Sequence, residues 1–229
     1  MNFKVLSLFP QLIDAYFAAS IPQKAVQRGL ISYQAINIRD YARDKHRTCD
    51  DAPYGGGPGM VLKPEPLGEA LEQVGANMHR TIYLTPSGKL FNQAYAEELA
   101  KEDTLILICG RYEGIDQRII DLYVDDEISI GDYILSSGEV AALVVIDTIF
   151  RLIPGVIKAE SLEEESLKQG LLEYPQYTRP EVYKGLRVPE VLLSGNHAEI
   201  ARWRYEQSVW KTKKNRPDLL RKGNTDGSD

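Results

Sequence analysis

The fold of this chain is decided by the stretch Glu127-Ile-Ser-Ile-Gly-Asp-Tyr-Ile-Leu-Ser-Ser-Gly-Glu139. Its opening apolar alternation predicts the end of a buried strand. After a turn at Gly131 and Asp132, the small residues Ser136-Ser137-Gly138 predict the start of a helix through the apolar segment Val140–Ile149. A polar, glycine-bearing loop between a strand and a buried helix leaves main-chain groups available to a ligand. Considered alone, the stretch is equally compatible with a tight connection that binds nothing.

Two other predicted strands also lead into glycine-bearing loops. The strand Thr81–Leu84 runs into the turn Thr85-Pro-Ser-Gly88, and the apolar strand Thr104–Cys109 runs into Gly110-Arg-Tyr-Glu-Gly114. Ligands of an open parallel sheet bind at the carboxyl ends of its strands. We therefore expect the three loops to line one pocket. None of them has a GxGxxG or Walker pattern, which argues against a dinucleotide or nucleoside triphosphate site.

The first part of the chain alternates strands and helices. A strand is predicted over Phe3–Phe9, a helix by the apolar spacing that begins at Leu12, and a second strand over Ile31–Ile38. This order is typical of an α/β fold. Further helices are predicted over Glu65–Val74, Asn92–Ala100 and Ile115–Leu122.

A glycine- and proline-rich segment interrupts this pattern. The nine residues Ala52-Pro-Tyr-Gly-Gly-Gly-Pro-Gly-Met60 hold four glycines and two prolines, a composition that excludes a helix or a strand. A flexible linker is one interpretation. Linkers favour Gly and Ser, however, whereas Tyr54 and the two prolines restrict the chain. We interpret the segment as a shaped loop that brings backbone close to a ligand.

The composition is that of a globular protein with a substantial core, since 43% of the 229 residues are apolar and 26% are charged. The formal net charge of −6 does not indicate a nucleic-acid binder. Cys49 and Cys109 have no metal-ligand spacing, so we expect a reducing, cytoplasmic setting. The N-terminus has no signal-peptide pattern, and the longest apolar run, Val140–Ile149, is too short to span a membrane.

The C-terminal part has a different charge pattern. Lys158–Gln169 is acidic and polar and predicts an interdomain linker before a small, mostly helical second domain. From His197 to Lys222, eight Lys or Arg residues are opposed by only three acids. This excess indicates contact with a polyanion, although a solvated helix face is the plainer alternative. Trp203 and Trp210 lie seven residues apart on the predicted helix and are expected in a core.

Five long motifs connect the chain to a known family. They are Asp51-Ala-Pro-Tyr-Gly-Gly-Gly-Pro-Gly-Met60, Cys109-Gly-Arg-Tyr-Glu-Gly-Ile-Asp116, Ser129-Ile-Gly-Asp-Tyr-Ile-Leu-Ser136, Tyr177-Thr-Arg-Pro180 and Leu193-Ser-Gly-Asn-His-Ala-Glu-Ile200. Together they closely resemble the motifs of the bacterial tRNA (guanine-37-N(1)) methyltransferases. The match extends from the N-terminus to about Leu220.

The resemblance implies a SPOUT-type α/β domain with a mostly parallel sheet and a deep trefoil knot, plus a small helical C-terminal domain that binds tRNA. Ordinary topology rules alone predict an unknotted sheet. The resemblance also implies a homodimer, S-adenosylmethionine as methyl donor, no membrane association, and magnesium as a candidate metal for which the sequence shows no ligand cluster. The expected parts are a knotted donor-binding domain (1–158), a linker that carries the candidate base (159–170) and a tRNA-binding domain (171–229).

The resemblance also assigns roles to single residues. Arg151 corresponds to an arginine that serves the chemistry, and Glu165 stands where the family has an aspartate. Ser137 replaces a family glycine. The Arg43–Arg47 cluster with His46, together with Asp50, is expected to border the tRNA and the pocket. The residues expected to hold the donor are Tyr83, Leu84, Thr85, Pro86, Gly110, Arg111, Tyr112, Glu113, Ile130, Gly131, Asp132, Tyr133, Ile134, Leu135 and Gly138.

The expected reaction needs two side chains besides the donor. Guanine N(1) must lose its proton to become a nucleophile, and negative charge then develops on O6, so the site needs a base and a cation. We assign Glu165 as the base and Arg151 as the cation. The neighbouring Glu163 and Glu164 leave the identity of the base open, and a surface ion pair is the alternative for Arg151. A ribose methyltransferase of the same superfamily and an RNA-binding protein without turnover are the competing functions.

Overall fold

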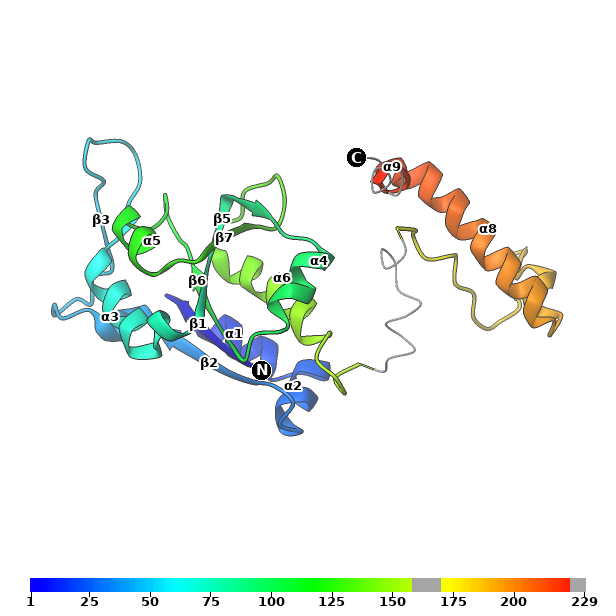
Figure 1. Cartoon of the computed structure of the whole chain (residues 1–229), viewed down its shortest axis with the longest axis horizontal. Helices are drawn as coiled ribbons and strands as arrows, with labels where there is room; N and C mark the ends of the chain where they lie inside the picture. The colour runs from blue at the N-terminus through cyan, green and yellow to red at the C-terminus, as the bar shows by residue number, and fades with distance from the viewer. Residues whose placement is uncertain (158–169, 223–229) are drawn as a thin grey trace, which may run out of the picture. The chain divides into compact units, whose positions relative to one another are not determined.

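The computed structural model describes residues 1–157 and 170–222, which belong to two compact units, 1–157 and 158–229. Figure 1 shows the sheet and most helices in the first unit and the long helix α8 in the second. Each unit is described by itself.

The first unit is built on a five-stranded sheet with the order β2-β1-β6-β5-β7, in which all neighbouring strands are parallel. Parallel strands need crossover connections, and helices supply them. The mostly parallel α/β fold predicted from the sequence is confirmed at this level. The strands are β1 (Asn2–Ser7), β2 (Ser32–Asn37), β5 (Arg80–Leu90), β6 (Thr104–Cys109) and β7 (Asp126–Ser129).

Helices cover both faces of this sheet. One apolar cluster packs helices α1 (Gln11–Phe17), α2 (Ser20–Gln27), α4 (Gln93–Leu99) and α6 (Gly138–Phe150) against one face. A second cluster packs the 3₁₀ turn η1 (Ile38–Tyr41), α3 (Pro64–Val74) and α5 (Gln117–Tyr123) against the other.

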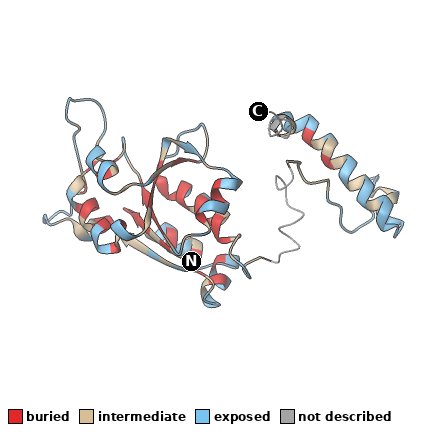
Figure 2. Cartoon of the chain, viewed as in Figure 1, coloured by how far each residue is buried: buried red, intermediate tan, exposed pale blue. Residues whose placement is uncertain are grey.

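The central strand β6 explains why the sheet is buried on both sides. Leu105, Leu107 and Cys109 point into the first cluster, whereas Ile106 and Ile108 point into the second. Side chains of a strand alternate between faces, so a strand covered on both faces must be apolar at every position. Figure 2 shows buried residues concentrated in the strands and in α6.

The turn predicted at Thr85-Pro-Ser-Gly88 is not a strand end. It is an irregularity inside β5, whose pairing with β7 shifts register between Leu84 and Lys89 before the two strands pair again. Gly88 makes the second pairing possible, because a Cβ at this position would lie 2.5 Å from the backbone of Glu127. The sequence shows the turn residues but not the return of the strand beyond them.

The glycine-rich segment forms the loop of a small ribbon. Strands β3 (Asp50–Asp51) and β4 (Val61–Leu62) are antiparallel, and the residues between them form neither helix nor strand, as predicted. The ribbon and the separate helix α2 were not predicted, because strands of two residues have no periodicity to detect. A 3₁₀ turn, η2 (Ala76–Met78), follows α3.

The described part of the second unit is built around α8 (His197–Asn215), which is followed by α9 (Pro217–Lys222). Asn196 caps α8 by accepting a hydrogen bond from the amide of Glu199, which places His197 at the helix start. Before α8 come a short hairpin, β8 (Val182–Tyr183) and β9 (Leu186–Arg187), and the 3₁₀ turn η3 (Glu190–Leu193).

A charged network at the N-terminal end of β5 yields a stability prediction. Burial of Asp126 opposes its ionisation, but hydrogen bonds from Arg80 (2.6 Å) and Tyr95 (2.5 Å) outweigh burial and hold the pKa of Asp126 below its ordinary value. Such a group contributes stability above its unfolded pKa of about 3.9, and the contribution is lost as the pH falls through the folded-state pKa. We expect Asp126→Asn to lower the unfolding free energy by about 1–3 kcal/mol at pH 7.

The difference between wild type and this variant is expected to shrink as the pH falls below about 4. Urea denaturation followed by circular dichroism over a pH series measures it. Asp121→Asn is the control, because Asp121 accepts only an exposed hydrogen bond from Gln117. An Asp126→Asn deficit that is the same at pH 7 and in acid would contradict the assignment.

Candidate functional site

A pocket of about 260 Å³ lies between the irregular part of β5, the ends of β6 and β7, and the start of α6. The three glycine-bearing loops predicted to converge do so here. The pocket is lined by Tyr83, Leu84, Thr85, Pro86, Gly110, Arg111, Tyr112, Glu113, Gly114, Ile128, Ser129, Ile130, Gly131, Tyr133, Ile134, Leu135, Ser136, Ser137, Gly138 and Ala141.

This lining includes every residue that the sequence nominated for the donor except Asp132. Six further lining residues were not nominated individually for the donor. Three of them, Gly114, Ser136 and Ser137, lie inside the loops that were predicted to line the pocket, and the other three are close in sequence to nominated residues. The six are Gly114, Ile128, Ser129, Ser136, Ser137 and Ala141.

Close backbone contacts shape the pocket. The amide of Gly138 donates to the carbonyl of Gly110 at 2.8 Å, and a Cβ at Gly138 would lie 2.6 Å from the Gly110 nitrogen. A Cβ at Gly110 would lie 2.8 Å from the ring of Tyr83. Real Cβ atoms do not approach backbone this closely, so glycine is required where α6 begins against the end of β6.

Two titratable side chains beside the pocket are held in their neutral forms. Burial, followed by the negative charge of Glu127, raises the pKa of the Tyr83 hydroxyl. Burial, followed by the charge of Glu139, raises the pKa of the Cys109 thiol well above its ordinary value. The Cys109 thiol is therefore not a nucleophile, since only the thiolate is reactive. Of the two, Tyr83 lines the pocket and contributes an uncharged side chain to its wall, whereas Cys109 lies in the core behind it.

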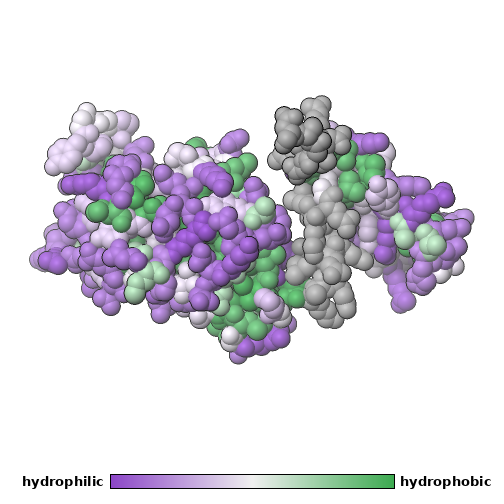
Figure 3. Space-filling view, viewed as in Figure 1, coloured by the Kyte–Doolittle hydropathy of each residue, from purple (hydrophilic) through white to green (hydrophobic). Residues whose placement is uncertain are grey.

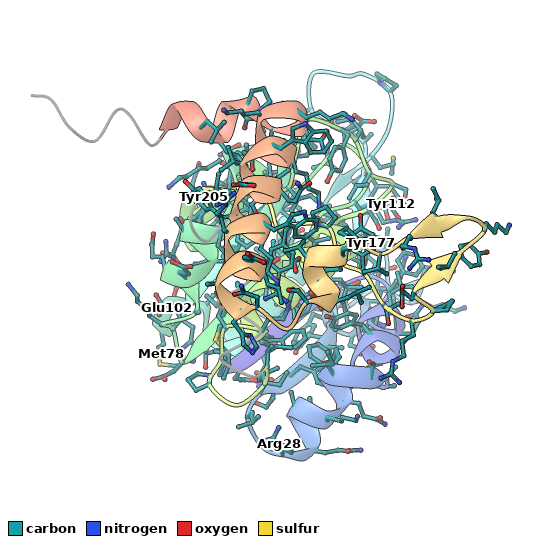
Figure 4. The ribbon with its side chains drawn as sticks, turned by 90° about the vertical axis from the view of Figure 1, so that its right-hand side faces the viewer. Arg28, Met78, Glu102, Tyr112, Tyr177 and Tyr205 are labelled. Atoms are coloured by element: carbon teal, nitrogen blue, oxygen red, sulfur yellow. The ribbon has the colours of Figure 1, made fainter. Side chains whose placement is uncertain are left out.

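The rim of the pocket is more exposed and carries charge. Glu113 is exposed, and the guanidinium carbon of Arg111 lies 4.5 Å from the ring centre of Phe9. Tyr112 (Figure 4) is also exposed and has a φ of 58°, an uncommon left-handed conformation for a residue other than glycine. A loop under such strain is a common feature of binding sites.

The ribbon β3–β4 is bonded directly to the pocket loop. The amide of Glu113 donates to the carbonyl of Met60 at 3.0 Å, and the amide of Leu62 donates to the carbonyl of Gly114 at 3.0 Å. The basic turn that precedes the ribbon is organised by Asp44, whose carboxylate accepts from the amides of His46 and Thr48. These bonds, above all the one from Thr48, lower the pKa of Asp44.

Arg151 does not lie in this pocket. It caps the C-terminal end of α6, whereas the pocket lies at the N-terminal end. Thirteen helical residues with a rise of 1.5 Å each separate the two ends by about 20 Å. One copy of the chain therefore does not bring Arg151 to the pocket. Glu165, the other catalytic candidate, lies outside the described residues, as do Glu163 and Glu164.

The basic residues of the second unit divide into two groups. Some hold the unit together: Lys211 donates to the carbonyl of Glu173 at 2.9 Å, and Arg204 lies 4.7 Å from the ring centre of Tyr174. Lys213 and Lys214 are exposed on α8. The core position expected for Trp210 is not observed, because its side chain is 56% exposed in this unit and Lys214 lies over its ring.

Comparison with known proteins identifies the protein family to which this chain belongs. A family model described as tRNA (Guanine-1)-methyltransferase TrmD matches residues 1–222. The chain belongs to this family. The resemblance of its motifs and the expectation of a methyltransferase are thereby confirmed.

Curated relatives with the same description align with this chain over nearly their whole length. Two proteins named "tRNA (guanine-N(1)-)-methyltransferase" come from Treponema denticola and Treponema pallidum. The first is 61% identical over 227 residues, which cover 99% of this chain and 93% of the relative. The second is 60% identical over 220 residues, which cover 96% and 88%. A protein of the same name from Borreliella burgdorferi is 58% identical over 224 residues, covering 97% and 94%.

Membership of this TrmD methyltransferase family implies S-adenosylmethionine as the methyl donor. Within residues 1–157 and 170–222, no group of three or more His, Cys, Asp or Glu side chains is arranged to hold a metal ion. The same part of the chain contains no helix long and apolar enough to cross a membrane.

The contact between Gly138 and Gly110 predicts a defect in donor binding. A methyl group at residue 138 would push α6 away from the end of β6, so we expect Gly138→Ala to weaken S-adenosylmethionine binding at least about tenfold. Isothermal titration calorimetry measures this affinity. Gly68→Ala is the matched control, because a Cβ at this position of helix α3 would make an ordinary 3.4 Å contact with the side chain of Ile119 on α5. Equal affinities for the two variants would contradict the role of this contact.

Proposed function

We propose that this protein transfers the methyl group of S-adenosylmethionine to N(1) of guanosine 37 in the anticodon loop of tRNA. The observation that carries the proposal is the convergence of three motif loops into one pocket in a chain that belongs to the TrmD family. The position in tRNA rests on the resemblance of the five sequence motifs. A ribose methyltransferase is disfavoured because the relatives are named for guanine N(1).

The pocket suits the donor chemically. An adenosine needs a largely apolar cleft with a few backbone groups to fix its orientation, and Leu84, Ile134 and Leu135 provide apolar walls beside the close-packed glycines. The sulfonium, which supplies the methyl group when the donor is bound, is positively charged. Glu113 and Asp132 are the carboxylates nearest in sequence to the pocket loops, and Glu113 lines the pocket itself.

Two side chains would carry the proton and charge changes on the guanine. Glu165 would accept the N(1) proton, a role worth roughly two to four orders of magnitude in rate. Arg151 would stabilise the negative charge that develops on O6 through its guanidinium. Glutamate is one methylene longer than the family's aspartate, but its reference pKa is only about 0.4 units higher. Replacing aspartate by glutamate therefore alters the position of the carboxylate more than its basicity.

A homodimer resolves the separation between Arg151 and the pocket. The catalytic arginine would come from one copy and the donor pocket from the other. The face of α6 that carries Val140 (50% exposed) and Val144 (43% exposed) supports this arrangement, since side chains four residues apart share a helix face. Figure 3 shows a separate apolar patch on the first unit near the C-terminal end of α6. Burying such a face is the usual reason for subunit association.

The remaining assignments rest on the family and on local features. The chain after β7 returns from the edge of the sheet to Gly110 on the central strand, which supports a knotted SPOUT-type topology. Lys213 and Lys214 support tRNA binding by residues 171–229, with residues 159–170 as linker and 1–158 as the donor-binding domain. The buried free thiols Cys49 and Cys109 support a cytoplasmic setting. Magnesium stays a candidate on family grounds, and no step is assigned to it.

The catalytic assignments predict specific losses of activity. Arg151→Ala and Glu165→Gln are each expected to slow methyl transfer at least about 100-fold, while donor binding is retained. The assay is single-turnover transfer from labelled S-adenosylmethionine to a tRNA transcript with guanosine at position 37, followed by nucleoside analysis of the product. Glu164→Gln is the control. Full activity of Glu165→Gln, with loss in Glu164→Gln, would move the base to the neighbouring residue, and a methylated ribose would overturn the reaction.

A two-copy site predicts complementation. Arg151→Ala keeps an intact pocket and Gly138→Ala keeps an intact arginine, so a mixed dimer has one complete site only if the two parts come from different copies. The two variants are unfolded and refolded together and assayed at a donor concentration too low to fill the Gly138→Ala pocket. We expect about a quarter of wild-type activity, because half the dimers are mixed and each has one complete site of two. The same mixture left without subunit exchange is the control. No recovery in a mixture shown to contain mixed dimers would place both parts in one copy.

A further inference from the structure

A carboxylate is buried directly behind the contact between Gly110 and Gly138. Glu139 has no exposed surface, and its Oε1 accepts a 2.6 Å hydrogen bond from the hydroxyl of Ser7. The oxygen of the same hydroxyl accepts from the amide of Phe9 at 2.7 Å. Oε2 of Glu139 is also buried and has no hydrogen-bond partner in the part of the chain that the structure describes. The hydrogen bond that the described residues give to this carboxylate therefore comes from a neutral group.

The carboxylate lies beside the glycine wall of the donor pocket. Gly138 and Gly110 both line the pocket, and they are the chain neighbours of Glu139 and Cys109. Burial, followed by the charge of Glu139, raises the pKa of the Cys109 thiol, which places the carboxylate close to the end of β6. A Cβ at Gly138 would lie 2.8 Å from the Cα of Cys109. The wall next to the charge therefore has room for main chain but not for a side chain.

The start of α6 would otherwise give this side of the pocket a positive potential. The N-terminus of a helix carries a partial charge of about half a positive unit, and α6 begins at Gly138 on the pocket wall. S-adenosylmethionine brings a sulfonium with a full positive charge, which such a potential disfavours. Glu139 is the acid in the first turn of α6. Its carboxylate supplies negative charge at the end of the helix where a bound cation needs it.

Burial makes the charge of Glu139 effective over a distance. Glu113 lines the pocket, but it is exposed, and dissolved ions screen exposed charges beyond about 8 Å at physiological ionic strength. A buried charge is screened much less. Two unit charges about 10 Å apart, at an effective dielectric constant of about 20, change a binding constant by roughly tenfold. Glu139 can therefore act on a cation in the pocket without touching it.

We propose that Glu139 is a specificity-determining residue that favours the cationic donor over its neutral product. Methyl transfer breaks the bond between sulfur and the methyl carbon, and the electron pair of that bond stays on sulfur while the carbon bonds to the guanine. The product, S-adenosylhomocysteine, is a thioether without the sulfonium charge. The attraction of Glu139 is lost with that charge, so the residue favours donor binding and product release. This inference rests on the methyl donor of the proposed function and not on the tRNA position that is methylated.

The test measures the affinity of the full-length protein for S-adenosylmethionine and for S-adenosylhomocysteine by isothermal titration calorimetry. Glu139→Gln keeps the shape of the side chain and an oxygen that can accept from Ser7, but it removes the charge. We expect this variant to lower the ratio of donor affinity to product affinity about 3- to 10-fold. A residue with a purely structural role would change both affinities by the same factor. An unchanged ratio would therefore overturn the inference.

Three further variants separate the charge of Glu139 from other effects. Ser7→Ala removes the 2.6 Å hydrogen bond but keeps the carboxylate, so we expect the ratio to stay within about twofold of wild type. Glu72→Gln is the matched control, because it neutralises a glutamate that accepts a 2.8 Å hydrogen bond from Tyr123 elsewhere on the unit. A ratio that falls in Glu113→Gln and not in Glu139→Gln would assign the preference to the rim of the pocket and overturn the inference.

The wild-type protein alone provides a test that does not depend on the folding of any variant. We expect it to bind the donor more tightly than the product, and the ratio to change less than about twofold between about 50 and 500 mM sodium chloride, because a buried charge is little screened. A preference that disappears in salt, or no preference at all, would overturn the inference while leaving the pocket a donor site. If wild type binds neither compound, the donor assignment and this inference both fail.

Discussion

The contact between the backbones of Gly138 and Gly110 is the constraint on which the rest of the structure depends. Strand β7 lies at the edge of the sheet, whereas β6 lies at its centre, so the chain must cross the ends of the strands before α6 can begin. A hydrogen bond of 2.8 Å fixes the crossing where no side chain fits. The loop that makes the crossing is also one wall of the pocket. Fold and site are therefore determined by the same few atoms.

A buried carboxylate stands directly behind this contact. Glu139 follows Gly138, has no exposed surface, and accepts a 2.6 Å hydrogen bond from the hydroxyl of Ser7 on β1. Its Oε2 has no partner among the described residues, and burying such an atom is costly. The position in the first turn of α6 offsets part of this cost, because the helix N-terminus favours negative charge. The bond also ties the start of α6 to β1, so the loop is held from two strands.

The sequence predicted those secondary-structure elements that depend on a local pattern of residues. The strand predicted over Thr104–Cys109 and the helix predicted over Asn92–Ala100 are both found, the first through its apolar side chains and the second with Asn92 as its cap. The continuation of β5 beyond Gly88 and the exposure of Trp210 depend on partners remote in sequence, which no local pattern encodes. For the site, the motifs marked the pocket because its loops are contiguous segments. They did not show that Arg151 lies a helix length away, since that follows from geometry in space.

Helix α6 fixes the distance between the pocket and Arg151. Its buried residues, from Ala141 to Phe150, pack rigidly against the sheet, so the helix holds the pocket at one end and Arg151 at the other at a constant spacing of about 20 Å. A spacing of that size makes the isolated subunit unable to place both groups on one guanine. If a second copy supplies the arginine, methyl transfer becomes a property of the assembled protein alone.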